Sequence, residues 1–204
     1  MMHGASVPNH LWFLLSLSTH CASLQTGGYS LVGTIPKELS LFQHVRELVL
    51  GYNSLTGTIP TEICQMSSLE NLDLASNDLT GTIPSNIGQL SAHLTILRLW
   101  DNQLTGTIPK TVGALTKLHH FDVFRNQLTG SVPIEVRNLV ELRSFLCAGN
   151  EVTGSLNPVF CKNSDGNYDT LDAEQFPKLF KVFADCAGYN PDITCDCCHE
   201  CHAA

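Results

Sequence analysis

The chain has 204 residues, enough for one domain or one short repeat array with a hydrophobic core, and too few for a large multidomain protein. Charged residues form 15% of the chain and hydrophobic residues 43%, which excludes both a disordered polyampholyte and a membrane-spanning bundle. Eleven basic against nineteen acidic residues give a net charge of -8. Because binding to a phosphate backbone needs a concentrated basic face, this balance argues against a nucleic-acid partner.

Residues 1–23 allow two interpretations. The segment Leu11–Leu17 is a short apolar run of the kind found in secretory signal peptides, although no Lys or Arg precedes it. It is too short for a transmembrane helix. Alternatively, Val7-Pro8 and the leucines that follow it match the offsets of the repeats described below, which favours a degenerate N-terminal repeat.

Residues 24–157 form about six units of 24 residues, and the repetition predicts the architecture. A unit of this length cannot bury its own apolar edge, so successive units must stack into a solenoid. Gly-Thr-Ile-Pro recurs at 33–36, 57–60, 81–84 and 106–109, with degenerate copies at 130–133 and 154–157. An asparagine recurs with the same period as Asn53, Asn77, Asn102, Asn126 and Asn150.

Each unit can be interpreted physically. Leu72 and Leu74 alternate as in a strand with one buried face, and Asn77 follows where the chain turns. Its side-chain amide is expected to bond to backbone groups of the bend, and the copies are expected to stack as a ladder. Apolar residues spaced by three over 63–69 predict a 3₁₀ or helical turn on the outer face. One unit has 25 residues, and its extra residue falls at 91–93, on the outer arc.

The pattern LxxLxLxxNxLxGxIP, present at Leu69–Pro84 and Leu118–Pro133, resembles the plant-type leucine-rich repeat. This resemblance implies an α/β solenoid, a right-handed superhelix with a parallel β-sheet on the concave face and 3₁₀ or helical turns on the convex face. Similar proteins are ectodomains of receptor-like kinases and polygalacturonase-inhibiting proteins. The Cys-rich tail resembles most the C-terminal cap of stand-alone algal leucine-rich-repeat proteins.

Residues 158–204 are expected to close the array. Leu179, Val182 and Ala184 have the spacing of one more strand. Six cysteines follow the repeats: Cys161, Cys186, Cys195, Cys197, Cys198 and Cys201. Their even number and the adjacent pair favour three disulfides, as does the resemblance to Cys-rich caps, whereas His199 and His202 leave a zinc site as the alternative. Of the other three cysteines, Cys147 is expected to be buried and Cys64 to lie on the outer arc. Cys21 is expected near a cleavage site or, weakly, paired with Cys64.

The concave face carries the candidate binding site. Positions four, two and one before each ladder asparagine flank the inward strand residues and are expected to face solvent. Arg98 is then expected between Asp73 and Asp122, and Trp100 beside Phe124. Exposed aromatic residues next to charges are typical of binding hot spots, although the charges could merely neutralise one another while the aromatics shield the sheet. The candidate ligand-binding residues are Trp100, Phe124, Arg98, Asp73, Asp122, Tyr52 and Arg125.

These features predict a secreted or cell-surface recognition module that binds a protein, peptide or glycan, as a receptor-like ectodomain or as an inhibitor. The sequence contains no catalytic motif, so neither an enzyme nor a cofactor is predicted. Signalling would require a partner such as a membrane-bound co-receptor, and the chain could also be a fragment of a membrane-anchored protein. The alternatives are a metal-binding tail and, as a minor hypothesis, ice binding by the repeated Thr-Gly-Thr segments.

Overall fold

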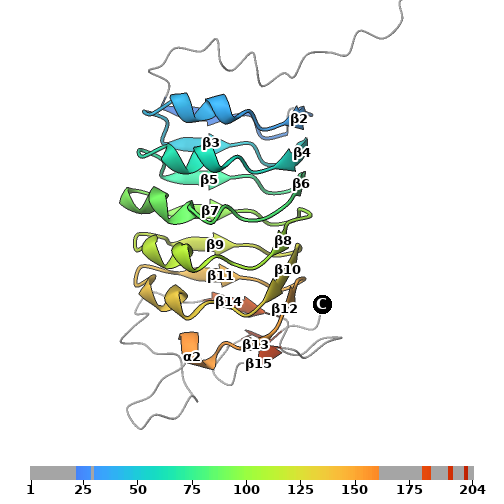
Figure 1. Ribbon diagram of the computed structural model, residues 1–204, viewed down its shortest axis with the longest axis vertical. Coiled ribbons are helices and arrows are strands. Elements are labelled where there is room, and N and C mark those ends of the chain that lie inside the picture. Colours follow the sequence, from blue (N-terminus) through green and yellow to red (C-terminus); the bar gives the residue numbers. More distant parts are fainter. Residues whose placement is uncertain (1–21, 29, 161–180, 185–192, 195–199, 202–204) are drawn as a thin grey trace, which may run out of the picture.

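The computed structural model describes residues 22–28, 30–160, 181–184, 193–194 and 200–201. Within these residues the chain winds through successive coils that stack in sequence order (Figure 1). Each coil passes from a strand of one sheet through a turn to a strand of a second sheet, and returns along a 3₁₀ helix. The predicted leucine-rich-repeat solenoid is thus confirmed.

One parallel sheet runs the length of the stack. Its eight described strands are hydrogen-bonded in the order β1 (Ser23–Gln25), β3 (Glu47–Val49), β5 (Asn71–Asp73), β7 (Ile96–Arg98), β9 (His120–Asp122), β11 (Ser144–Leu146), β14 (Lys181–Ala184) and β16 (Glu200–Cys201). Each of the first six strands contributes a buried central residue, as in Leu48, Leu72 and Leu97, while its neighbours on either side face away from the core. This alternation is the pattern predicted for a half-buried strand.

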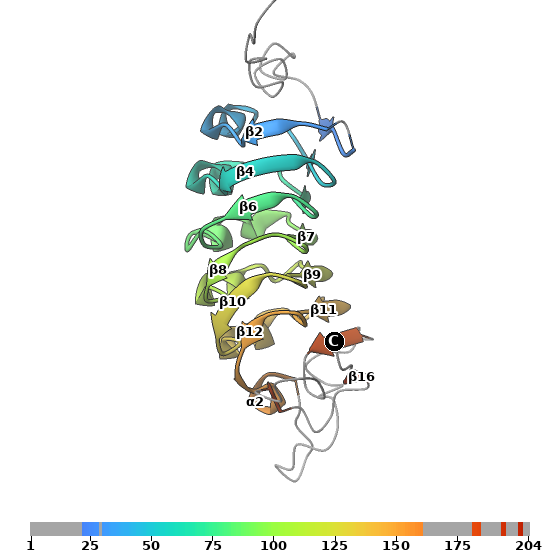
Figure 2. The same cartoon turned by 90° about the vertical axis from the view of Figure 1, so that its right-hand side faces the viewer.

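Shorter strands form the second side of each coil (Figure 2). They pair as β2 (Val32–Thr34), β4 (Ser54–Thr58) and β6 (Asp78–Thr80), and as β8 (Thr105–Gly106), β10 (Gln127–Gly130) and β12 (Glu151–Val152). The bridge between Thr82 and Thr105 connects the two groups. The third side consists of the 3₁₀ helices η1 (Lys37–Leu41), η2 (Thr61–Gln65), η3 (Ile87–Ala92), η4 (Lys110–Ala114) and η5 (Ile134–Asn138).

The extra residue of the 25-residue unit lies on the outer arc, as the sequence predicts. Its helix η3 has six residues, whereas η2 and η4 have five. Strand pairing is undisturbed, since Asn71 pairs with Ile96 and Leu72 with Leu97. The insertion therefore lengthens the outer turn and leaves the sheet register intact.

The C-terminal segment adds strands to both sides of the stack. β14 pairs with β11, and Val182 is buried opposite Phe145, as expected for the predicted additional strand. The short helix α2 (Asn157–Phe160) follows the last full coil, and β15 (Ile193–Thr194) pairs with β13 (Gly154–Ser155). Leu179 and five of the six tail cysteines lie outside the described residues, and only the backbone of Cys201 is described. The disulfide cap therefore stays a prediction, as does the assignment of residues 1–23, of which residues 1–21 are not described.

Close packing of the 3₁₀ helices allows a test of the stacking. A Cβ atom added to Gly113 in η4 would overlap the carbonyl oxygen of Glu135 and lie 2.7 Å from the Glu135 Cβ atom. Gly113→Ala is therefore expected to lower the free energy of unfolding by about 1–3 kcal/mol, the usual cost of overpacking. Urea denaturation measures this loss.

The matched control is Gly27→Ala, whose added Cβ atom would lie 3.3 Å from the nearest atom, the Gly51 carbonyl oxygen. It is expected to change stability much less. Equal stabilities of the Gly113→Ala variant and the wild type would contradict the close contact between η4 and η5.

Candidate binding surface on the concave face

The ladder asparagines hold the edge of the concave sheet. The Asn102 amide nitrogen donates to the carbonyl oxygens of Leu74, Leu99 and Trp100 at 3.0–3.2 Å, and its Oδ1 accepts from the Leu79 N–H at 3.0 Å. The same four kinds of hydrogen bond recur at the other ladder asparagines, Asn53, Asn77, Asn126 and Asn150. Each asparagine closes its own turn and also binds the preceding coil, which makes the edge a rigid support for neighbouring side chains.

The residue before each ladder asparagine has a left-handed backbone. Tyr52, Ser76, Asp101 and Arg125 have φ between 51° and 57°, and Gly149 has φ 69°. Side chains other than glycine rarely adopt this conformation. The Asn-ladder hydrogen bonds on either side keep the backbone in place, so these four side chains project from fixed positions on the rim.

An acid–base–acid row crosses the concave face. Strand pairing places Arg98 opposite Asp73 on one side and opposite Asp122 on the other. The Arg98 Nη1 atom donates to Asp73 Oδ2 at 3.2 Å. The second oxygen of Asp73 accepts from the Ala75 N–H at 3.1 Å, and an Asp122 oxygen accepts from the Phe124 N–H at 3.0 Å.

Asp73 is more enclosed than the sequence predicts, with 8% exposure. Gly51 explains this burial, because a Cβ atom there would lie 2.9 Å from Asp73 Oδ1. Asp73 thus orients the half-exposed Arg98 side chain, which is the member of this ion pair that a ligand can reach.

Aromatic side chains lie beside this row. Trp100 and Phe124 are half-buried rather than fully exposed, while Tyr52 is 62% exposed. The Tyr52 and Trp100 rings meet edge to face with centroids 5.5 Å apart, although the two residues belong to coils separated by a third. Small residues in the intervening coil, of which Ala75 is fully buried, leave room for this contact. The Arg125 guanidinium lies 5.1 Å from the Phe124 ring centroid.

Histidine and arginine side chains border the same strands. Burial lowers the pKa of His120, and the positive charges of Arg98, His119 and Arg143 lower it further. His120 is therefore neutral at neutral pH.

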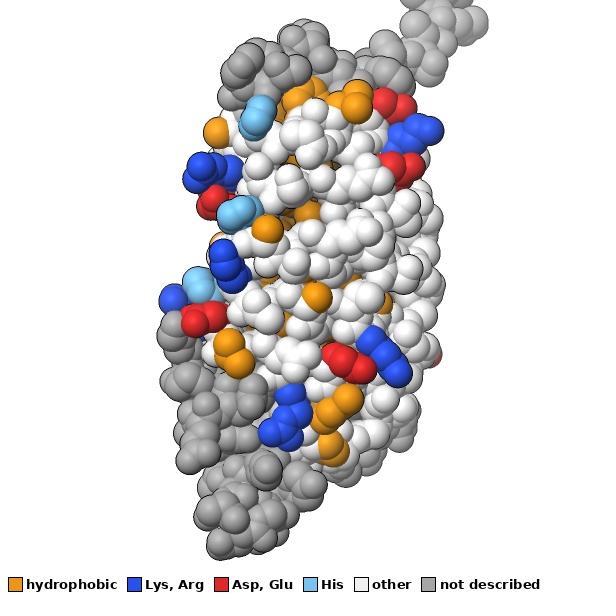
Figure 3. All heavy atoms as spheres, turned by 60° about the vertical axis from the view of Figure 1, so that its left-hand side comes forward, with side chains coloured by type: hydrophobic (Ala, Val, Ile, Leu, Met, Phe, Trp, Pro, Cys, Tyr) orange, Lys and Arg blue, Asp and Glu red, His pale blue; other side chains and the backbone are white. Residues whose placement is uncertain are grey.

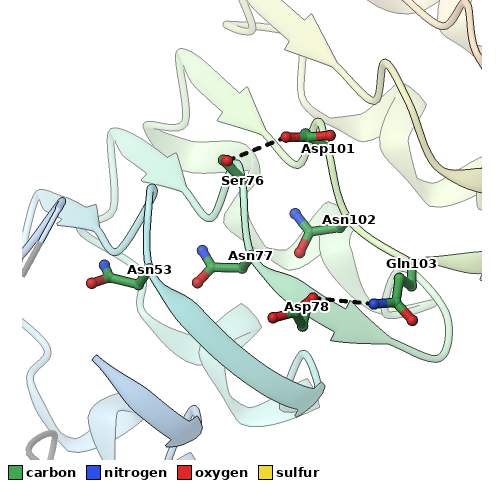
Figure 4. A pocket seen from close by; sticks show the side chains of 7 residues that line it. All are labelled: Asn53, Ser76, Asn77, Asp78, Asp101, Asn102 and Gln103. Carbon is green, nitrogen blue, oxygen red and sulfur yellow. Dashed lines mark hydrogen bonds between the residues drawn. The ribbon is translucent and has the colours of Figure 1, made fainter. Parts of the chain in front are cut away.

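A polar pocket of about 340 Å³ opens where the chain leaves the concave sheet for the second sheet (Figure 4). It is lined by Ser76, Asp78, Asp101 and Gln103, with Asn53, Asn77 and Asn102 of the ladder between them. We call it the rim pocket. The sequence predicts the ladder asparagines but not the pocket, because its walls come from residues about 24 positions apart on three coils.

The convex side differs from the concave face. Figure 3 shows that its charged side chains lie mainly along the edges and that hydrophobic side chains appear as separate spots. Leu41, Ile134 and Val140 are exposed residues of this kind. Among the described residues, the aromatic cluster of the concave side thus has no counterpart on the convex face shown in this view.

The repeated threonines have a structural role. The hydroxyl groups of Thr56, Thr80, Thr105 and Thr129 lie 3.2–3.4 Å from a glycine carbonyl oxygen of the preceding coil, to which they donate. The second threonine of each Thr-Gly-Thr segment covers the glycine of the next coil, and a Cβ atom on Gly81 would lie 2.8 Å from the Thr58 methyl group. Gly81 also has φ 75°, so glycine is required there for two reasons. These contacts between coils give the repetition a structural role, and ice binding stays a minor hypothesis.

Two cysteines of the repeats are buried. Cys147 follows β11 directly and is fully buried, as predicted. Cys64 lies in η2 and carries a free thiol, so the weakly predicted pairing with Cys21 is wrong. Burial raises the pKa of Cys64 to about 11, which keeps the thiol protonated and unreactive.

The described residues include no group of three or more His, Cys, Asp or Glu side chains placed to hold a metal ion. Within the same part of the chain, no helix has both the length and the apolar character that a membrane-spanning segment needs.

Comparison with known proteins identifies the class of solenoid. The family model of the Leucine Rich Repeat matches residues 44–66, 68–90 and 93–115. The LRR ectodomain of the receptor kinase SOBIR1 from Arabidopsis thaliana is 33% identical, with a TM-score of 0.60 over 63% of this chain and 70% of that chain. The chain belongs to the leucine-rich-repeat family. No curated protein sequence matches it.

Two longer structures share the fold. PEPR1-AtPEP1 is 30% identical, with a TM-score of 0.72 over 87% of this chain and 22% of that chain. The plant peptide hormone receptor RGFR1 in complex with RGF2 is also 30% identical, with a TM-score of 0.65 over 75% of this chain and 22% of that chain. The present chain thus spans less than a quarter of these two receptors.

Proposed function

We propose that this chain is a non-enzymatic, extracellular recognition module that binds a protein or peptide partner on its concave face. The site is centred on Trp100, Phe124 and Arg98, with Asp73 and Asp122 holding the polar row in place. The observation that carries the proposal is the cluster of partly exposed aromatic rings beside Arg98. Large aromatic and arginine side chains supply most of the energy at protein interfaces.

The structural neighbours support the same class of function. One is a plant peptide hormone receptor in complex with RGF2, and another is the BIR3-SERK2 complex from Arabidopsis thaliana, which is 34% identical to this chain. By analogy, the partner is a peptide or the ectodomain of a membrane-bound co-receptor. The neighbours also include ectodomains of membrane receptor kinases, which favours a secreted or cell-surface location.

The concave site can be tested with peptides selected from a random display library against the purified protein. Replacement of both Trp100 and Phe124 by alanine is expected to weaken binding of the selected peptides at least tenfold, about 1.4 kcal/mol, because two hot-spot residues are lost. Biolayer interferometry measures the change. Circular dichroism of the variant checks that the solenoid remains folded.

The matched control is Ile134→Ala with Val140→Ala, which removes two exposed apolar side chains from the convex side. Binding to this control should equal binding to the wild type. Peptides that bind the Trp100→Ala, Phe124→Ala variant as tightly as the wild type would place the site elsewhere.

The metal-binding alternative concerns the tail, whose cysteine side chains lie outside the described residues. Mass spectrometry of the intact protein separates the two hypotheses. Three disulfides lower the mass by about two units each, while bound zinc with free thiols would favour the metal site.

A further inference from the structure

The rim pocket is rich in hydrogen-bond acceptors. Its ladder asparagines use their amide donors on backbone carbonyl groups, and their Oδ1 atoms accept backbone N–H groups. Asp78 and Asp101 therefore provide the main hydrogen-bonding capacity that remains for a ligand, since each carboxylate oxygen has more than one lone pair. The two carboxylates therefore favour a ligand that donates hydrogen bonds.

The two carboxylates have neutral partners. Gln103 Nε2 donates to Asp78 Oδ1 at 3.2 Å, and Ser76 Oγ donates to Asp101 Oδ2 at 3.2 Å (Figure 4). Neither Lys nor Arg lines the pocket. The ion pairs described in this part of the chain, Arg46–Glu70 and Arg98–Asp73, include neither Asp78 nor Asp101. Charge complementarity therefore points to a cationic ligand.

An aromatic pair comes directly before two of the pocket residues in the chain. Tyr52 and Trp100 directly precede the pocket residues Asn53 and Asp101 in the chain, and their rings contact each other. Aromatic rings attract cations at their faces and also accommodate the methylene stem of a long side chain. A basic side chain would thus meet carboxylates at its charged end and aromatic rings along its stem.

We propose that the rim pocket receives a Lys or Arg side chain of the partner that binds the concave face. This inference rests on the proposed function, because a peptide lying across Trp100 would pass the mouth of the pocket. The pocket is distinct from the Arg98 region of the concave face. Its lining carries the negative charges of Asp78 and Asp101, and Arg98 is not part of it. A partner of this surface then presents a basic residue at the rim, next to the residues that cover Trp100 and Phe124.

The pocket can be tested without the natural partner. The probes are Nα-acetyl-arginine methylamide, the lysine equivalent and the citrulline equivalent, which resembles arginine but is neutral. In NMR titrations of the ¹⁵N-labelled protein, the two cationic probes are expected to shift the amide signals of Ser76, Asp78, Asp101 and Gln103. The citrulline probe should leave these signals in place, and added salt should weaken the cationic probes.

The decisive variant combines Asp78→Asn with Asp101→Asn. Asparagine retains an acceptor for Gln103 and for Ser76, and it tolerates the positive φ of residue 101. This variant is expected to bind the arginine probe at least fivefold more weakly, because the cationic probe loses the attraction of both negative charges. The control variant is Glu38→Gln with Glu62→Gln, which removes two charges outside the pocket and should bind like the wild type.

Two results would overturn the pocket assignment. One is an equal response to arginine and citrulline, and the other is unchanged binding of the arginine probe by the Asp78→Asn, Asp101→Asn variant. The library peptides separate this inference from the proposed function. Selected peptides that depend on Trp100 and Phe124, but neither contain Lys or Arg nor respond to the pocket variant, reject the pocket and retain the concave site. Probe binding at the pocket together with peptides that ignore Trp100 and Phe124 retains the pocket and rejects the concave site.

Discussion

Replacement of Phe145 by alanine is expected to lower the free energy of unfolding by about 3–5 kcal/mol, the usual cost of deleting a buried phenylalanine ring. Phe145 is fully buried in β11. Its ring centroid lies 5.4 Å from that of Phe121 in the preceding coil and 5.4 Å from that of Phe160 in α2. The three rings thus connect the last full coil to the segment that closes the array. Removal of the middle ring leaves a cavity between two neighbours that cannot easily collapse.

The effect should be local as well as large. In a solenoid each coil contacts only its neighbours, so stability depends on the interfaces between adjacent coils. Phe145→Ala weakens the interfaces on both sides of β11, and the C-terminal coils are expected to unfold at lower urea concentration than the rest. Urea denaturation followed by circular dichroism gives the overall loss, and hydrogen exchange shows whether protection falls first in β11 and α2.

The matched controls are Phe145→Leu and Phe124→Ala. The first keeps an apolar side chain in the core and is expected to cost much less than alanine. The second removes a half-buried ring from the surface and should also be milder. A Phe145→Ala variant as stable as the Phe124→Ala variant would contradict the role of the phenylalanine row.

The core of the fold could be predicted from the sequence because each coil repeats the same short pattern of buried strand residues and a ladder asparagine. Leu72 and Leu74 alternate with polar residues, and Asn77 follows three positions later, so strand, turn and stacking direction all depend on a short segment. The insertion at 91–93 confirms this reasoning, since it lengthens η3 while Ile96 keeps its place in the sheet.

The surface was less predictable because it depends on side-chain direction across coils. The sequence gives the order of Asp73, Arg98 and Asp122, but not the burial of Asp73, which depends on the absence of a side chain at Gly51. Tyr52 contacts Trp100 across an intervening coil that has small side chains. The sequence predicts contacts between adjacent coils only, so this contact was not predicted.

The rim pocket was missed for a related reason. Its acidic residues, Asp78 and Asp101, occupy different offsets in their repeats, so neither a column of equivalent positions nor a local motif brings them together. The signal available in the sequence was the variation among residues just before and just after each ladder asparagine. These positions differ from coil to coil because packing does not determine them.

Asn102→Ala is expected to lower the free energy of unfolding by about 2–4 kcal/mol, because several buried backbone groups lose their partners at once. The Leu79 N–H loses its acceptor, and the carbonyl groups of Leu74 and Leu99 lose their donor. Alanine also leaves a small void at a position that is 9% exposed. Urea denaturation measures the loss.

The ladder makes a site-specific prediction as well. Hydrogen exchange at the Leu79 amide should accelerate in the Asn102→Ala variant, since its acceptor has been deleted, whereas the Leu128 amide, bound to Asn150, should keep its protection. Asn138→Ala at an exposed asparagine of η5 is the control and should stay within about 0.5 kcal/mol of the wild type. Unchanged exchange at Leu79 would mean that the turns support themselves without the side-chain amides. In that case, interactions other than the Asn-ladder hydrogen bonds would have to hold the rim that supports the aromatic side chains and the rim pocket.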